Sequence, residues 1–296
     1  MNPALDASPA TPGPETSLPA LRAEIDAIDD ALHDLVMRRA AVVARLAASR
    51  VKGADAAPLR PGREAAILRR LLARHSGPLP AAAVVRLWRE ILSASNAMQG
   101  GFTVALPAGD AELRRAARAR FGETAALDPK DGPEAALAAL AEGAAQAAVL
   151  PVPAAQGPGA WWMGLDAPRL RVAAVLPFYA AAPAPSAVVV TRDGPDPSGD
   201  DRSLLRLAFG PGDAPPQPGA LAGALRDAGL RGCAPTLPGR HRGGAWVLAE
   251  VEGAVAEDDP RLSALRARSR AERVQPLGFY ATPVRAAAAA PPDGGE

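Results

Sequence analysis

Arginine side chains interrupt the apolar seam of a long amphipathic segment near the start of the chain. Arg39 fills a seam position that otherwise carries aliphatic residues, and Arg50 follows eleven residues later. At about 3.6 residues per helical turn, Arg50 points within about 20° of Arg39, so both guanidiniums face the same way. Arg22 lies seventeen residues before Arg39. Because it is rotated by about 100°, it cannot serve the same site on the same helix without distortion, but it could reach a site on a partner.

Two cations on one apolar face need an anionic partner, because burying an unpaired charge is costly. The seam offers no acidic residue that could neutralise them. The alternative is that Arg38, Arg39 and Arg50 are solvated side chains of an arginine-rich chain. That alternative explains a single arginine well and a pair on one face poorly, so the pattern favours a site for a small dianion.

A second polar group follows the first along the chain. Arg63 and Glu64 open a helix, and Ser95 and Gln99 stand four residues apart on an otherwise apolar helix face. Taken alone, Glu64 could simply favour a helix N-terminus, and Ser95 and Gln99 could mark a helix leaving the core. Together with the arginines they describe a cavity for a compact ligand with two carboxylates and a hydroxyl.

The composition narrows the class of protein. The 296 residues carry 33 basic and 32 acidic side chains, a net charge of +1, which gives no general attraction to nucleic acid or anionic membrane. The single cysteine, Cys233, excludes an internal disulfide and fits a cytoplasmic protein. No signal peptide, membrane span, phosphate loop or cluster of metal ligands is evident, so we expect no cofactor and no metal.

The elements that must position these residues form a multidomain α plus α/β chain. Periodicity predicts a helix from Leu18 to about Arg50, a shorter one from near Arg63, and a third over residues 80–99, making an all-α domain over 18–100. The length of the first helix indicates packing against another long helix, for example from a second copy of the chain. Residues 1–17 and 285–296 have the composition of disordered tails.

Beyond the helices, strand and helix patterns alternate. Residues 101–193 read as an α/β region, DGPDPSGDD as a linker, and residues 202–284 as a βαββαβ unit of the ferredoxin-like type.

Residues 18–99 resemble the helical chorismate mutase family. The matching segments are LPALRAEIDAID with Arg22, the Arg38-Arg39 pair, the basic residue at Arg50, RPGREAAILRRL and WREILSASNAMQ. The resemblance implies an intertwined homodimer with shared active sites. It also implies the pericyclic rearrangement of chorismate to prephenate, a step of the shikimate pathway toward phenylalanine and tyrosine that needs no cofactor.

The resemblance also assigns roles to the polar residues. Arg22 from the partner and Arg39 would clamp the substrate carboxylates, and Arg63 and Ser95 would line the pocket. Among the catalytic residues, Glu64 would take the ring hydroxyl and Gln99 the ether oxygen of the breaking bond.

Two positions depart from the family pattern. Arg50 stands where the family has a lysine that bonds the ether oxygen and a carboxylate. Arg60 stands where many members have an aspartate that helps to hold the hydroxyl.

The second part resembles two further families. Residues 102–193 are similar to a shortened prephenate dehydratase domain, on FTVALPAGDAELRRAARARFG and AALAALAEGAAQAAVLPVP. The family's Gly-Thr/Ser-Phe/Tyr-Ser opening, its Glu-Asn pair and its Thr-Arg-Phe motif are missing, so we expect a single-lobed remnant without dehydratase activity.

Residues 203–283 resemble an ACT regulatory domain, on PGALAGAL and VQPLGFYAT. This implies an amino-acid effector site, but CAPTLPGR replaces the family's Glu-Ser-Arg-Pro motif, and a dimerisation module is the alternative. The rival functions are a bifunctional mutase–dehydratase, a non-catalytic amino-acid-sensing protein, and an isochorismate-pyruvate lyase of the same helical fold.

Overall fold

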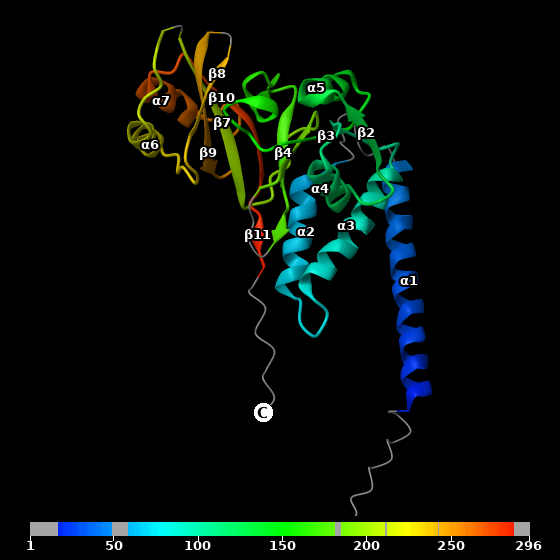
Figure 1. Ribbon diagram of the computed structural model, residues 1–296. Helices are drawn as coiled ribbons and strands as arrows, with labels where there is room; N and C mark the ends of the chain where they lie inside the picture. Colours follow the sequence, from blue (N-terminus) through cyan, green and yellow to red (C-terminus); the bar gives the residue numbers. More distant parts are fainter. Residues whose placement is uncertain (1–16, 49–58, 181–184, 211, 242, 287–296) are drawn as a thin grey trace, which may run out of the picture. The chain divides into compact units, whose positions relative to one another are not determined.

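The computed structural model describes residues 17–48, 59–180, 185–210, 212–241 and 243–286. It contains two compact units, Met1–Lys52 and Gly53–Glu296, each of which is described by itself. Most of the two predicted tails and Arg50 lie outside the described residues. The predicted order of a helical region followed by an α/β region is confirmed (Figure 1).

The first unit contributes one long helix, α1 (Leu18–Ala48), which agrees with the predicted helix over its described length. None of its residues is buried. The predicted apolar stripe is present, and its aliphatic side chains are between 42% and 57% exposed. These side chains are Leu21, Ile25, Ile28, Leu32, Leu35, Val42 and Leu46.

The second unit begins with the predicted helical pair, α2 (Pro61–Ala73) and α3 (Ala81–Ala97), which lie side by side (Figure 1). Pro61 suits the first turn of α2, but Arg60 at the N-cap supplies no side-chain cap. Asp196 takes that role from far along the chain. Its Oδ2 accepts the Arg63 backbone N–H at 3.0 Å, and its Oδ1 accepts from the Arg60 guanidinium at 2.7 and 2.9 Å.

The segment that was expected to be only a linker therefore packs on α2. Gly62 makes this close approach possible, because a Cβ there would overlap the backbone carbonyl of Asp196. Arg69 adds further ties, donating to Ser198 Oγ at 2.9 Å and to the carbonyls of Asp200 and Thr282 at 2.8 Å. The helical pair is thus bound to the α/β part of the same unit.

Across the described residues, nine strands form one sheet in the order β2-β1-β3-β6-β4-β10-β7-β9-β8. The strands of its first half are β1 (Thr103–Pro107), β2 (Ala126–Lys130), β3 (Ala147–Leu150), β4 (Arg171–Leu176) and β6 (Ala187–Thr191). Those of its second half are β7 (Asp201–Phe209), β8 (Leu237–His241), β9 (Gly244–Glu252) and β10 (Arg273–Ala281). A small second sheet pairs β5 (Tyr179–Ala180) with β11 (Val284–Arg285).

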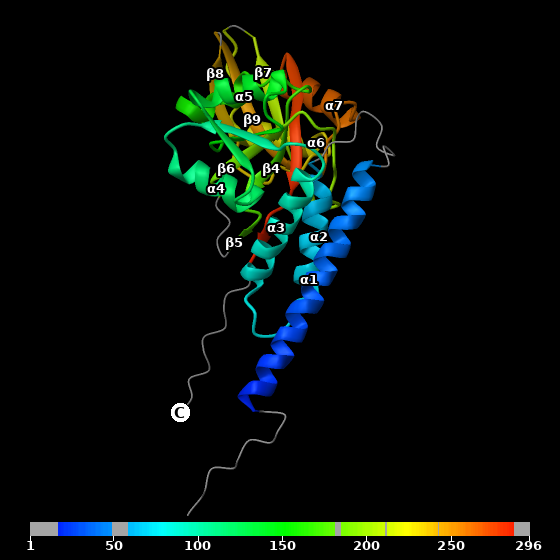
Figure 2. The same cartoon turned by 90° about the vertical axis from the view of Figure 1, so that its right-hand side faces the viewer.

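Alternating side chains divide the core between the two faces of the sheet. In β1, Val104 and Leu106 pack with α4 (Ala111–Phe121), while Ala105 packs with α5 (Gly132–Glu142) on the other face. The 3₁₀ segment η2 (Gly157–Met163) joins the α5 side. The helices α6 (Pro218–Asp227) and α7 (Pro260–Ser269) lie side by side over the second half of the sheet (Figures 1 and 2).

The order β7-α6-β8-β9-α7-β10 reproduces the predicted βαββαβ sequence, with strand order β10-β7-β9-β8. It continues into the first half of the sheet through the parallel pairing of β10 with β4. The predicted boundary between residues 193 and 202 therefore falls within one continuous sheet, and the predicted division into domains stays a prediction. The sequence patterns did not predict β2, η2, β5 or β11.

Gly278 is required where the two halves of the sheet meet. Its φ is +121°, and an added Cβ would overlap the Val172 carbonyl oxygen and lie 2.7 Å from the Val172 nitrogen. We expect Gly278→Ala to lower the free energy of unfolding by roughly 1–3 kcal/mol. The measurement is urea denaturation, with Gly219→Ala in α6 as the control, because a Cβ there meets nothing within 4 Å. Equal stability of the two variants would contradict the argument.

Candidate functional site

Glu64 lies at the centre of a buried polar cluster between α2, α3 and α4. Its side chain is 5% exposed. Oε2 accepts from Arg89 Nη1 at 3.0 Å and lies 2.6 Å from Arg120 Nη1, while Oε1 accepts from Asn96 Nδ2 at 3.3 Å. The acid thus comes from α2, one cation and the amide from α3, and the second cation from α4. The Glu64 carboxylate therefore joins three helices at one point.

The charges of this cluster do not balance within it, because two guanidiniums share one carboxylate. Burial first, and the neighbouring Arg120 second, lower the pKa of Arg89 to about 9, which still leaves it charged at neutral pH. Aromatic rings supply part of the compensation. The Arg89 guanidinium lies 5.5 Å from the Phe178 ring centroid, and that of Arg120 lies 4.9 Å from the Phe121 centroid.

Of the other predicted site residues of the second unit, Arg63 and Ser95 lie on α2 and α3, and Gln99 lies two residues beyond the end of α3. Ser95 is buried on α3, where its Oγ donates to the Ile91 carbonyl at 2.6 Å, and Gln99 Nε2 donates to the Ser95 carbonyl at 2.9 Å. Arg63 lies in the first turn of α2, and its side chain is exposed. The structure therefore brings Glu64, Ser95 and Gln99 into one helical pair.

The predicted site residues of the first unit lie along α1. Arg22 is exposed and Arg39 is half-buried. Because the two units are described separately, the grouping of these arginines with Glu64, Ser95 and Gln99 stays a prediction. Arg50 adds nothing to this comparison, since it lies outside the described residues.

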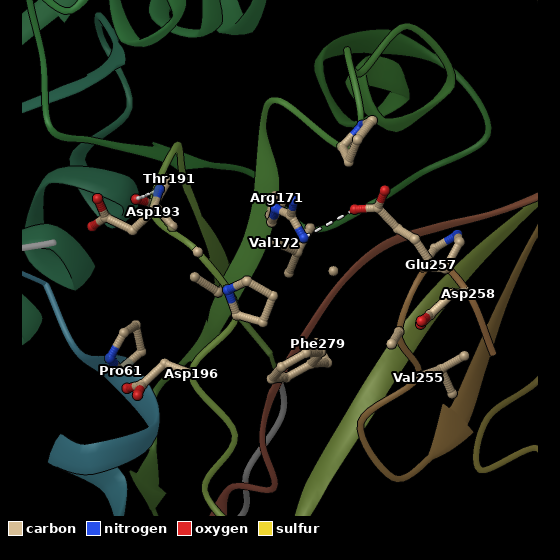
Figure 3. A pocket seen from close by; sticks show the side chains of 17 residues that line it. Pro61, Arg171, Val172, Thr191, Asp193, Asp196, Val255, Glu257, Asp258 and Phe279 are labelled. Atoms are coloured by element: carbon tan, nitrogen blue, oxygen red, sulfur yellow. Dashed lines mark hydrogen bonds and ion pairs between the residues drawn. The ribbon is translucent and has the colours of Figure 1, made fainter. Parts of the chain in front are cut away.

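A cavity of about 300 Å³ lies elsewhere in the second unit, beside β4 and β10 (Figure 3). Its one lining arginine, Arg171, is paired with Glu257 at 3.0 Å. The backbone N–H of Asp193 donates to Thr191 Oγ1 at 3.0 Å. Burial raises the pKa of the Asp193 carboxyl. Asp196 is occupied by Arg60. With its cation neutralised and further carboxylates around it, this cavity does not suit a dianion.

Other kinds of site find little support in the part of the chain that the structure describes. No group of three histidine, cysteine, aspartate or glutamate side chains there could hold a metal ion. Burial raises the pKa of the Cys233 thiol to about 12, so it stays protonated and is a poor nucleophile. Within the same residues, no helix combines the length and apolarity that crossing a membrane requires.

Comparison with known proteins assigns the helical part. Residues 21–100 match the family model of chorismate mutase type II. This stretch is a chorismate mutase type II domain. It includes α2, α3 and most of α1, and therefore Glu64, Arg89 and Asn96 but not Arg120.

Further likenesses extend beyond the mutase domain. The bifunctional chorismate mutase/prephenate dehydratase of Stutzerimonas stutzeri is 31% identical over 140 residues, covering 46% of this chain and 38% of that protein. The chain thus matches well under half the length of this curated relative.

Two solved structures are more distant. GqqA, described as a novel type of quorum quenching acylase, is 22% identical with a TM-score of 0.44, covering 62% of this chain and 96% of that one. The prephenate dehydratase of Arthrobacter aurescens in complex with L-Phe is 14% identical, with the same TM-score, covering 64% and 93%. These two likenesses carry no argument about function.

The sequence reading missed three partners of Glu64, namely Arg89, Asn96 and Arg120. A signal was present for each of them. Arg89 and Asn96 are seven residues apart on one face of the mutase domain's last helix. Arg120 interrupts the buried face of α4, as Arg39 interrupts the seam of α1. The cluster therefore ties the mutase domain to the α/β region.

Because two guanidiniums share one carboxylate, removing the carboxylate should destabilise the fold more than removing one guanidinium. Glu64→Gln leaves two buried guanidiniums without a carboxylate, and we expect it to lower the free energy of unfolding by about 3–5 kcal/mol. Arg120→Met leaves the Arg89–Glu64 pair intact and keeps an apolar side chain of similar length, so its loss should be clearly smaller. Urea denaturation of both variants measures the difference, and an equal or larger loss in Arg120→Met would contradict the charge assignment.

Proposed function

We propose that the chain catalyses the rearrangement of chorismate to prephenate in aromatic amino-acid biosynthesis. The observation that carries this proposal is the chorismate mutase type II domain over residues 21–100. The reaction needs no nucleophile, because one bond breaks as another forms within the same molecule. Its demands are a fixed conformation of the substrate and donors at the ether oxygen, where charge develops in the transition state.

In this proposal one group of residues binds the substrate carboxylates and another stabilises the ether oxygen. Arg39 and, from a second copy of the chain, Arg22 hold the two carboxylates, with Arg63 and Ser95 lining the pocket. Arg50 and Gln99 stabilise the ether oxygen of the breaking C–O bond. Bidentate guanidinium–carboxylate pairs give this arrangement both affinity and orientation.

Glu64 is the proposed acceptor for the ring hydroxyl. Its oxygens face two guanidiniums, and a carboxylate paired in this way offers acceptors to a hydroxyl donor. Its Oε1 receives only Asn96 among the described partners, at 3.3 Å, which leaves acceptor capacity on that oxygen. Arg60, where the family resemblance leads us to expect an aspartate, binds Asp196 instead, while Arg89 and Arg120 hold Glu64 in place.

A homodimer with shared active sites is part of the proposal. The exposed aliphatic stripe of α1 supports it, because a helix of this length gains most of its stability from packing an apolar face. We place the protein in the cytoplasm, in accord with its single cysteine and balanced charge.

The α/β region is proposed to be a single-lobed, prephenate dehydratase-like remnant without dehydratase activity. The shortness of the segment between β3 and β4, residues 151–170 with η2, supports the single-lobed reading. The βαββαβ part is proposed to be an ACT-like module, either binding an amino-acid effector or supporting dimerisation. The alternatives are a bifunctional mutase–dehydratase, which the S. stutzeri relative favours, and a non-catalytic amino-acid-sensing protein.

The mutase proposal is tested by removing one carboxylate clamp. We expect Arg39→Ala to lose nearly all chorismate turnover, since one charged donor at such a site is worth roughly 3–4 kcal/mol, a factor of several hundred in rate. Loss of chorismate and formation of prephenate are followed optically, and far-UV circular dichroism checks helix content. Arg38→Ala, the neighbouring exposed arginine, is the matched control and should keep near-normal turnover. Near-normal turnover in Arg39→Ala would reject the site assignment.

The dehydratase question has its own assay. Incubating the purified full chain with prephenate should yield no phenylpyruvate above the uncatalysed rate, because the motifs for that step are missing. Clear phenylpyruvate formation would favour the bifunctional alternative. An absence of both activities would favour the non-catalytic sensor.

A further inference from the structure

A small arginine-lined cavity adjoins the Glu64 cluster, between α3, α4 and the end of β4. Its volume is about 190 Å³, below the ~300–1,000 Å³ of pockets for drug-sized ligands. Four guanidinium-bearing side chains line it, Arg86, Arg89, Arg115 and Arg120. No acidic side chain occurs among the described residues of its lining. The cavity is therefore strongly biased toward an anion.

The buried cations of this cavity are incompletely neutralised. The side chains of Arg89 and Arg120 are 8% and 4% exposed, and both approach the same oxygen of Glu64 through Nη1. In the described part of the chain, neither pairs with a carboxylate other than that of Glu64. Arg86 enters no ion pair there either. A second anion at the cavity would complete the charge balance that Glu64 meets only in part.

Part of the cavity lining is apolar. Val85, Leu176 and Phe178 contribute to it, and Leu176 and Phe178 are buried. The Phe178 ring lies 5.5 Å from the Arg89 guanidinium, so it is held in place beside the charged wall. A ligand with a carboxylate at one end and a ring or short alkyl group at the other would satisfy both walls. An ammonium group would be repelled by Arg86, Arg89 and Arg120, while the fourth lining arginine, Arg115, is paired with Glu112 at 2.5 Å.

We propose that this cavity binds a small organic carboxylate that has an apolar body and no amino group, such as an aryl-acetic or 2-oxo acid. The carboxylate would pair with the guanidinium edges of Arg89 and Arg120 that Glu64 leaves open. Its apolar body would lie against Phe178. The proposal does not depend on mutase activity, because none of its ligand contacts involves the substrate clamps proposed above.

The test is calorimetric titration of the full chain with four probes. Phenylacetate should bind, while 2-phenylethylamine, L-phenylalanine and inorganic phosphate should bind at least ~10-fold more weakly, since each lacks either the net negative charge or the apolar body. Failure of phenylacetate to bind would overturn the proposal. Phosphate binding as tightly as phenylacetate would also overturn it, because the apolar wall would then play no part.

Variants decide whether phenylacetate binds at this cavity. Ala82→Phe fills the cavity without removing a charge, and Arg86→Gln removes an exposed lining cation. Each should weaken phenylacetate binding by ~10-fold or more. Arg114→Gln, on the exposed face of α4 and outside the lining, is the matched control and should leave binding unchanged. Unchanged binding in both lining variants would place the ligand elsewhere and reject the proposal. Chorismate turnover measured on the same samples reports separately on the mutase.

Discussion

One buried carboxylate determines how the second unit is held together. Glu64 is removed from water, and its desolvation is offset only because Arg89 and Arg120 both reach its Oε2. Arg89 lies on α3 and Arg120 on α4. Because both guanidiniums contact the same oxygen of Glu64 on α2, this contact fixes the three helices relative to one another. Packing of apolar side chains alone would allow several orientations of a short helical pair. The charged contact has one geometry, which is why α2, α3 and the α/β region form one compact unit.

A second acid far along the chain repeats this principle at the surface. Asp196 caps α2 through the Arg63 backbone N–H and binds the Arg60 guanidinium. The end of α2 that carries Glu64 is therefore held from two directions. Arg60, at the position where the family resemblance leads us to expect an aspartate, forms this ion pair with Asp196. In this chain the residue at that position therefore stabilises the scaffold.

Local sequence patterns predicted the long helices and strands, but they could not predict contacts between residues far apart in the chain. The helices α1, α2 and α3 follow from apolar spacing, and the strands β1, β3 and β6 from continuous apolar runs. The strand β2 was missed because Ala126–Lys130 is short, contains a proline and lies half-exposed at a sheet edge. Arg120 was missed because its partner stands 56 residues earlier in the chain. Among the predicted site residues, Glu64 was found from its local motif, but its role in joining helices required the fold.

The proposed active site draws on two bodies with different kinds of stability. Glu64, Ser95 and Gln99 belong to a helical pair that ion pairs fix to the sheet. Arg22 and Arg39 belong to α1, a helix with no buried residue and an exposed aliphatic stripe. A stripe of this kind is stable only when another apolar surface covers it. In the proposed dimer, the packing that covers the stripe also positions Arg22 and Arg39 for the substrate. Assembly and substrate binding would therefore depend on the same seven aliphatic side chains.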